Sequence, residues 1–246
     1  MSEFDSKTAS SRQTYPVTES NRVKRIAERA SYDEATIHSI IDSSYLCHVG
    51  FMQNARPVVI PMAHWRIGGY LYLHSAKKGR FAKICVDNDI AVSIATFDGI
   101  ALGHSAFNHS YNYRSVVVQG RCEVVNDPEQ KKFAMRAFVD HVVAGRWETL
   151  RPVTDSEMRA VVVMRIRLST VSAKARDEFP DKETDNPDWP VWVGVIPARL
   201  AFGAPEADPV RNKVSPAPEQ VREYAGIDRF TPTYRFKTNS PADEGD

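Results

Sequence analysis

The sequence lacks the common short motifs for nucleotides and metals. It contains no G-x-G-x-x-G, no Walker-type glycine loop and no H-E-x-x-H, and no pair of carboxylates lies within an obvious catalytic element. Its three cysteines, Cys47, Cys85 and Cys122, are far apart and form no C-x-x-C pair, which argues against a disulfide framework and a thiolate metal site. We therefore expect no metal, name no catalytic residue, and predict a reducing, cytoplasmic location.

Excess charge and long apolar runs are also missing. Lys plus Arg number 32 and Asp plus Glu 31, so the formal net charge of +1 creates no global field for nucleic acid. No stretch approaches the roughly 20 apolar residues that span a bilayer, and the N-terminus has no apolar signal segment. We expect a soluble protein with neither a nucleic-acid nor a membrane partner.

Length and composition predict one domain. The chain has 246 residues of which 42% are hydrophobic, which is enough for one good core. Both ends are poor in periodic apolar residues, and the C-terminal end is rich in proline. We predict a flexible tail over residues 1–21, a domain over 22–202 and a proline-rich arm over 203–246.

Apolar alternation predicts a mainly β domain with flanking helices. Strands are expected near residues 46, 57, 71, 91, 115 and 161, with Gly68-Gly69 and Asp98-Gly99 as turns. The capping-box spacing of Ser31 and Glu34 predicts a short helix, and Asp127-Pro128 predicts the start of a longer one. Six mostly antiparallel strands favour a small Greek-key barrel, because closure removes exposed edges.

The long helix is expected to end near Gly145. Its buried stripe is predicted to contain the following residues: Phe133, Ala134, Ala137, Phe138 and Val142.

The most informative stretch is a short strand that runs into a cationic, glycine-containing turn and then a helix start, over residues 70–81. There Ser75 offers a hydroxyl group, and Gly79 lets the backbone come close to a ligand. Lys77, Lys78 and Arg80 offer positive charge. The first N–H groups of the helix point the same way, so the arrangement suits a phosphate group. A solvated basic turn is the alternative interpretation.

Two further features permit more than one interpretation. Alternation places His74 on the strand face opposite Ser75, where it is either a half-buried polar residue or a neutral imidazole beside a planar ligand. The segment 188–200 contains two tryptophans, a glycine and an arginine, which suit ordinary core, a flat ring system with an anion, or a dimer contact.

From about Arg22 to Leu200 the chain resembles the pyridoxamine-5'-phosphate-oxidase-like, FMN-binding split-barrel proteins. The branch with the nitroimidazole-resistance proteins and other flavin-nucleotide-binding proteins is the most similar. Several motifs occur in the same order, namely residues 25–33, 47–50, 58–61, 71–80, 110–117, 145–147 and 191–194. The oxidases themselves have a lysine where Pro61 closes the second-strand motif here, so the resemblance does not imply pyridoxamine phosphate oxidation.

The resemblance implies a six-stranded antiparallel split barrel that forms a homodimer with a flavin, FMN rather than FAD or a deazaflavin, at the interface. It assigns the phosphate to Ser75, Lys78 and Arg80 and places His74 beside the ring or ribityl chain. The backbone of Val59, Ile60, Pro61 and Met62 is expected along the isoalloxazine edge. Trp192 and Arg199 are expected to act across the dimer. Weaker candidates for flavin or substrate contact are Asn112, Tyr113, Arg114 and Ser115.

Two functional hypotheses follow. The first is an FMN-dependent oxidoreductase that acts on an unidentified small molecule stacked over the flavin. The second is a binding or sensing protein for flavin or haem without turnover, because a barrel can hold a planar cofactor and the sequence assigns no catalytic acid or base.

Overall fold

The computed structural model describes residues 13–180 and 188–224, in which the chain forms two antiparallel sheets. The larger sheet comprises β1 (Ala30–Ser31), β2 (Leu46–Gln53), β3 (Arg56–Ala63), β6 (Ile90–Leu102), β7 (Ser110–Gly120), β10 (Thr170–Arg176) and β11 (Gly194–Pro197). The smaller sheet comprises β4 (Trp65–Ile67), β5 (Tyr70–Ala76), β8 (Glu123–Val124) and β9 (Val161–Arg167). The predicted mainly β, antiparallel class is confirmed.

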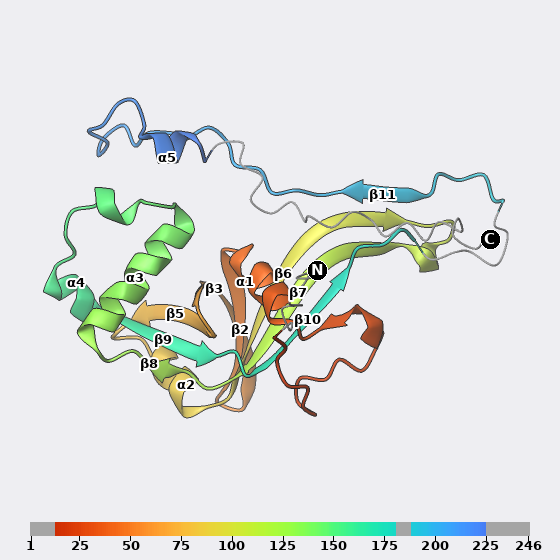
Figure 1. The fold of residues 1–246 in the computed structure, drawn as a ribbon, viewed down its shortest axis with the longest axis horizontal. Helices are drawn as coiled ribbons and strands as arrows, with labels where there is room; N and C mark the ends of the chain where they lie inside the picture. The colour runs from red at the N-terminus through yellow and green to blue at the C-terminus, as the bar shows by residue number, and fades with distance from the viewer. Residues whose placement is uncertain (1–12, 181–187, 225–246) are drawn as a thin grey trace, which may run out of the picture.

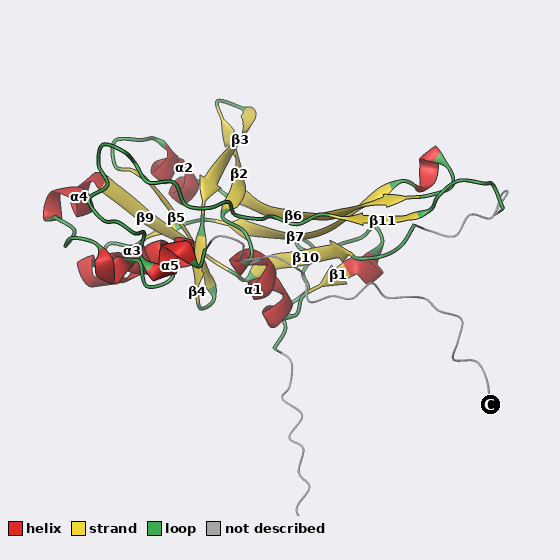
Figure 2. Cartoon of the chain, turned by 90° about the horizontal axis from the view of Figure 1, so that it is seen from above, coloured by secondary structure: helices red, strands yellow, loops and turns green. Residues whose placement is uncertain are grey.

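The strand orders are β1-β10-β7-β6-β2-β3, with β11 also on β6, and β4-β5-β9-β8. Figure 1 shows β6, β7 and β10 running together away from the smaller sheet. Figure 2 shows that the β2–β3 hairpin stands out from this layer. Its turn residues Asn54 and Ala55 both have positive φ, 51° and 59°, as a twisted two-residue hairpin requires.

The helices flank the sheets. They are α1 (Glu34–Asp42), α2 (Phe81–Asp87), α3 (Pro128–Val142), α4 (Asp155–Ala160) and α5 (Glu219–Arg222), with single 3-10 turns at Ala27–Arg29, Ala106–Asn108 and Trp147–Thr149.

Side-chain caps fix where α1 and α3 begin. The predicted start of α3 is confirmed, because the Asp127 carboxylate accepts from the Gln130 N–H at 2.8 Å. The predicted cap of α1 was wrong: Asp33, not Ser31, accepts from the Thr36 N–H, also at 2.8 Å.

The six predicted strands are present, but they are only part of the sheets. Three chain segments cross between the sheets almost without a turn, at His64 between β3 and β4, at Arg121-Cys122 between β7 and β8, and at Leu168-Ser169 between β9 and β10. The Gly68-Gly69 turn therefore joins β4 to β5 rather than β3 to β5. Two further strands, β10 and β11, follow the strand predicted near residue 161.

The prediction of a turn at Asp98-Gly99 was wrong. Strand β6 continues through this dipeptide as a bulge: Phe97 pairs with Tyr113 and Gly99 with Asn112, which leaves Asp98 as the extra residue. The edge of β6 is shared, because β2 pairs with its first part and β11 with Gly99 to Leu102.

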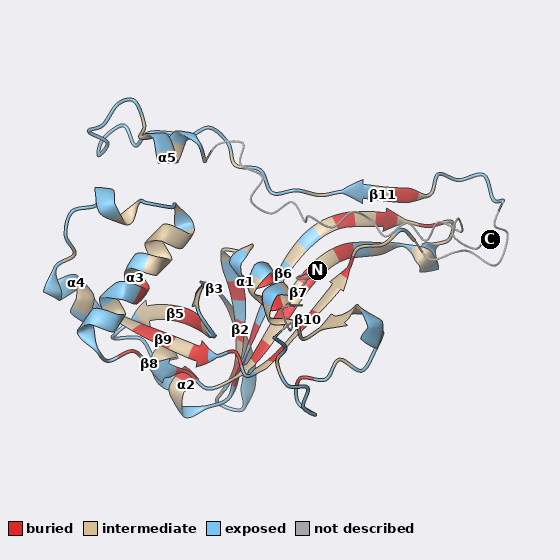
Figure 3. Ribbon diagram, viewed as in Figure 1, coloured by how far each residue is buried: buried red, intermediate tan, exposed pale blue. Residues whose placement is uncertain are grey.

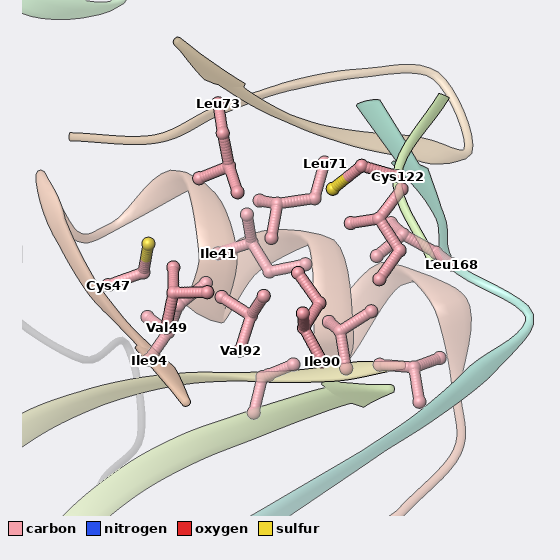
Figure 4. Packing of buried hydrophobic residues seen from close by; sticks show 14 of the residues in the cluster. Ile41, Cys47, Val49, Leu71, Leu73, Ile90, Val92, Ile94, Cys122 and Leu168 are labelled. Carbon is pink, nitrogen blue, oxygen red and sulfur yellow. The ribbon is translucent and has the colours of Figure 1, made fainter. Parts of the chain in front are cut away.

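The main core lies between the two sheets and includes α1. Figure 4 shows its close packing, to which Ile41, Cys47, Val49, Leu71, Leu73, Ile90, Val92, Ile94, Cys122 and Leu168 contribute. A second cluster lies under α3 and contains Trp65, Tyr72, Val125, Ala134 and Val163.

The predicted apolar stripe of α3 is only partly buried. Ala134, Ala137 and Phe138 pack on the second cluster, whereas Phe133 and Val142 are exposed. Figure 3 shows that exposed and partly buried stretches alternate along α3. Those two positions were predicted wrongly, because α3 covers the small sheet with a narrower face than its apolar residues suggest.

The C-terminal segment returns to the body of the protein after β11. Phe202 lies edge-on to Tyr45 with ring centroids 5.9 Å apart, and Tyr224 lies edge-on to Phe202 at 4.7 Å. The Tyr224 hydroxyl donates to the Val142 carbonyl at 2.6 Å. The predicted tail and arm both extend into residues outside the described ranges, and none of the described helices has the length and hydropathy to cross a membrane.

Candidate functional site

The corner between β5 and α2 is open and is held in place by the backbone. Lys77 N–H donates to the Ala160 carbonyl at 2.9 Å, which ties the turn to the end of α4. Gly79 N–H donates to the Ala76 carbonyl at 2.9 Å, and a Cβ on Gly79 would lie only 3.1 Å from that oxygen. Glycine therefore permits the tight turn, and residues 76–80 stay exposed.

This corner carries unsatisfied polar groups. Ser75 Oγ is buried and has no hydrogen-bond partner, which is a costly arrangement for a hydroxyl unless a ligand completes it. The side chains of Lys77, Lys78 and Arg80 are exposed and form no ion pair with any described residue. Unpaired cations beside an orphaned hydroxyl are the donor set that a phosphate group needs.

The predicted edge residues lie on β3, the terminal strand of the larger sheet. Val59 and Pro61 are exposed, whereas Ile60 and Met62 pack against the core. Strand β3 also contacts β5, so the fold brings this backbone toward the strand that carries Ser75. An edge strand leaves one side of its backbone open to a ligand or to another chain.

His74 does not face the same way as Ser75. Its ring packs on Phe138 and Trp65, with centroids 5.1 and 5.9 Å apart, inside the cluster under α3. Burial lowers the pKa of His74, and its Nδ1 is buried without a partner, as is Trp65 Nε1. The structure therefore separates the imidazole from the Ser75 hydroxyl by the thickness of the sheet.

Three of the candidate residues on β7 make side-chain contacts within the chain. Arg114 forms a two-point ion pair with Asp98, both N–O distances being 2.8 Å, and only 7% of its side chain is exposed. Asn112 accepts from Arg176 and donates to the Glu178 carbonyl at 3.1 Å. Ser115 Oγ donates to the Lys174 carbonyl at 3.0 Å. These contacts hold β6, β7 and β10 together.

The last candidates, Trp192 and Arg199, flank β11. The indole lies against Gly194, where a Cβ would come within 2.6 Å of the ring, yet 63% of Trp192 is exposed. Strand β11 pairs with Gly99 to Leu102, nine or more residues along β6 from its start beside α2. At about 3.3 Å per residue, β11 therefore begins roughly 30 Å along β6 from the end of this strand that follows α2, and Figure 1 shows α2 and β11 at opposite parts of the chain. One chain therefore does not bring the two groups together.

Three sizeable cavities lie in the described part of the chain. One of about 660 Å³ lies between α3 and α4, and one of about 640 Å³ lies beside β2 and β3 and includes Val59. One of about 560 Å³ adjoins the corner through Lys77. None of the three encloses both the corner and β3, so the candidate site in one chain is a surface rather than a pocket.

The sequence prediction missed residues that shape the site from a distance. Lys131 and Arg159 line the cavity beside Lys77, and they come from α3 and α4. No local pattern connects them with the corner. Asp98 was also missed as the partner of Arg114, because Asp-Gly resembled a turn.

Two antiparallel sheets around a shared core, with helices over the open ends, define a split β-barrel. A family model for pyridoxamine 5'-phosphate oxidase matches residues 33–175, more than half of the chain. The chain therefore belongs to the pyridoxamine 5'-phosphate oxidase family.

Solved structures support this assignment. A flavocytochrome from Azotobacter vinelandii is 36% identical, with a TM-score of 0.80 over 84% of this chain and 96% of that one. An FAD- and heme-binding protein from Mycobacterium smegmatis is 26% identical, with a TM-score of 0.76 over 80% and 98%. A Bacteroides thetaiotaomicron protein inferred to act in 5-nitroimidazole antibiotic resistance shares the fold at 22% identity, with a TM-score of 0.51 over 59% and 85%. No curated protein sequence matches the chain.

Proposed function

We propose that this protein binds a flavin nucleotide and catalyses the oxidation or reduction of a small molecule. The single observation that carries the proposal is the corner after β5, where the orphaned Ser75 hydroxyl lies beside unpaired cations. Family membership and two relatives described as a flavocytochrome and an FAD- and heme-binding protein support it. The sequence resemblance favours FMN, and the corner suits the phosphate next to the ribityl chain in FMN or FAD alike.

The residues of the chain hold and orient the nucleotide. Lys78 and Arg80 neutralise the phosphate, Ser75 donates its hydroxyl hydrogen, and the open edge of β3 from Val59 to Met62 lies along the ring. A bound flavin supplies the redox chemistry itself. The protein supplies position, charge and control of solvent access.

We further propose that two copies assemble with the flavin between them, in the cytoplasm. Trp192 and Arg199 lie beside β11 at the far part of β6, away from the corner in one chain, and a second copy can supply them. Large apolar side chains of the same part of the chain are exposed, including Phe97 at 53%, Tyr111 at 61% and Phe107 at 94%. Three free, buried cysteines suit a reducing compartment.

Flavin titration tests the proposal. Purified protein should retain a flavin spectrum or acquire it on incubation with FMN or FAD. Arg80→Ala should weaken the affinity by about 10-fold or more, because a charge-assisted contact contributes roughly 1.5–3 kcal/mol. Lys83→Ala is the matched control, since Lys83 lies on α2 and pairs with Asp87 at 2.7 Å. Absence of flavin binding by the unmodified protein would refute the proposal, and equal losses in both variants would remove Arg80 from the site.

A second candidate function is flavin or haem binding without turnover. The 36% identity to a flavocytochrome over most of both chains favours a haem in addition to the flavin. Histidine lines none of the three cavities described above, so we assign no haem ligand. A pyridine haemochrome spectrum of the purified protein tests for haem. Turnover with NADH or NADPH and an artificial acceptor separates the enzyme from the binding protein.

A further inference from the structure

The cavity of about 660 Å³ between α3 and α4 is separate from the candidate flavin site. Its walls come from α3, the 3-10 turn at Trp147–Thr149, residues 150–153, α4 and the first residue of β9. Of the described residues of the corner and of β3, none lines it. A ligand in this cavity is therefore a second molecule, distinct from the flavin nucleotide.

Most of the lining is apolar and suits an aromatic ring. It consists of the following side chains: Met135, Trp147, Leu150, Pro152, Val153, Met158 and Val161. The indole of Trp147 has a flat face on which a ring can stack, and methionine sulfur makes favourable contacts with aromatic rings. Leu150 is 41% exposed, which places it at the opening. The volume lies within the range of small-molecule binding sites.

Polar contacts within the chain hold these walls in place. Thr154 and Glu157 form a capping box that fixes the start of α4. Arg151 donates to both oxygens of the Glu157 carboxylate, at 2.5 and 3.1 Å, which ties the segment before α4 to this helix. The Trp147 N–H donates to the Asp140 carboxylate at 3.3 Å and so connects the 3-10 turn to α3. The cavity is therefore formed before a ligand binds, which lowers the entropy lost on binding.

One charge of the lining has no partner. Four ionisable side chains line the cavity, namely Lys132, Glu148, Arg151 and Glu157. Glu148 pairs with Arg136 on α3 at 2.6 Å, and Glu157 pairs with Arg151 at 2.5 Å. Lys132 forms no hydrogen bond or ion pair with a described residue. A single uncompensated positive charge beside an apolar surface favours a guest with a single negative charge.

We propose that this cavity binds a small aromatic carboxylate, whose ring packs on Trp147 and the two methionines and whose carboxylate pairs with Lys132. An uncharged ring leaves the ammonium group unpaired, and a phosphate dianion brings a second charge that no group of the lining balances. An aromatic monocarboxylate matches both the apolar surface and the charge. The site does not depend on the proposed function, because none of its residues is assigned to the flavin.

Calorimetric titration of the full-length protein with naphthalene-2-carboxylate tests the proposal, and naphthalene-2-carboxamide is the uncharged probe with the same ring. The carboxylate should bind about tenfold more tightly than the amide. Lys132→Gln should weaken carboxylate binding about tenfold and change amide binding less than about twofold, because it removes only the charge. Lys83→Gln is the control and should change neither, since Lys83 lies on α2 outside the cavity.

A second variant tests the opening of the cavity. Leu150→Asp places a negative charge there and should weaken carboxylate binding about tenfold or more. Circular dichroism shows whether each variant is folded. Equal affinity for the two probes, or unchanged carboxylate binding in Lys132→Gln, would overturn the proposal. Displacement of the carboxylate by haemin would assign the cavity to a macrocycle and overturn it as well.

Discussion

Stability should fall below neutral pH because of His64, the buried residue at which the chain crosses from the larger to the smaller sheet. Only 1% of this residue is exposed. Its Nε2 lies 3.1 Å from the Ile41 carbonyl and must carry the hydrogen, since a carbonyl only accepts. Nδ1 is then the unprotonated nitrogen, and it is buried without a partner. Protonation would create a buried N–H with nothing to receive it, so burial lowers the pKa of His64 from 6.5 to about 4.

The sign and size of the effect follow from linkage. The unfolded chain takes up a proton on His64 as the pH falls through about 6.5, whereas the folded protein does so only near 4. Stability is therefore complete above the unfolded pKa, declines between the two values, and declines no further below about 4. This residue accounts for about 2 kcal/mol lost between pH 7.5 and pH 5.0, and about 3 kcal/mol in total.

Urea unfolding at the two pH values measures the effect. His64→Gln keeps an amide N–H that can donate to Ile41 and removes the titration, so its loss between pH 7.5 and 5.0 should be smaller by about 2 kcal/mol. Burial also lowers the pKa of His38 and His74, and both contribute in the same direction in the protein and in the variant. His109→Gln, at an exposed histidine, should keep the original dependence. An unchanged pH dependence in His64→Gln would refute the reasoning.

Two other perturbations have definite outcomes. Asp98→Asn removes the charge of the carboxylate that makes the two-point pair with Arg114 and should cost about 1–3 kcal/mol in urea unfolding at pH 7.5; an unchanged unfolding free energy would mean that the pair does not stabilise the β6–β7 arm. Phe97→Asp, on the exposed face of β6, should convert the proposed dimer to a monomer in light scattering without a loss of secondary structure. A protein that is monomeric before the change, or a variant that stays dimeric, would contradict the proposed assembly.

Local patterns predicted the elements well, since alternation and caps are properties of a few neighbouring residues. The Asp127-Pro128 start of α3 and the six strand positions are of this kind. The sheet crossings could not be predicted in this way, because no local pattern near His64 or Leu168 shows that the chain passes from one sheet to the other. Which strand pairs with which is decided by burial across the whole core.

The candidate site also has one part that the sequence could show and other parts that it could not. The corner from Ser75 to Arg80 is contiguous, so its hydroxyl, charge and glycine could be recognised in the sequence. The cavity with Lys131 and Arg159 is assembled from three separate segments, and the partner of Arg114 lies sixteen residues away on a neighbouring strand. Only the folded arrangement could place these together.

The single extra residue in β6 shifts the inward-facing positions in the far half of this strand. Before it, Ile90, Val92 and Ile94 point inward, at even positions; after it, Gly99 and Ala101 do, at odd ones. A strand of the same length without the bulge would direct Ile100 inward and Ala101 toward solvent, whereas deleting Asp98 would join Phe97 to Gly99 in regular register and keep Gly99 and Ala101 inward. The aspartate that forms this bulge also anchors the neighbouring arginine, so its deletion would remove a charge contact of the arm without changing which residues the arm buries.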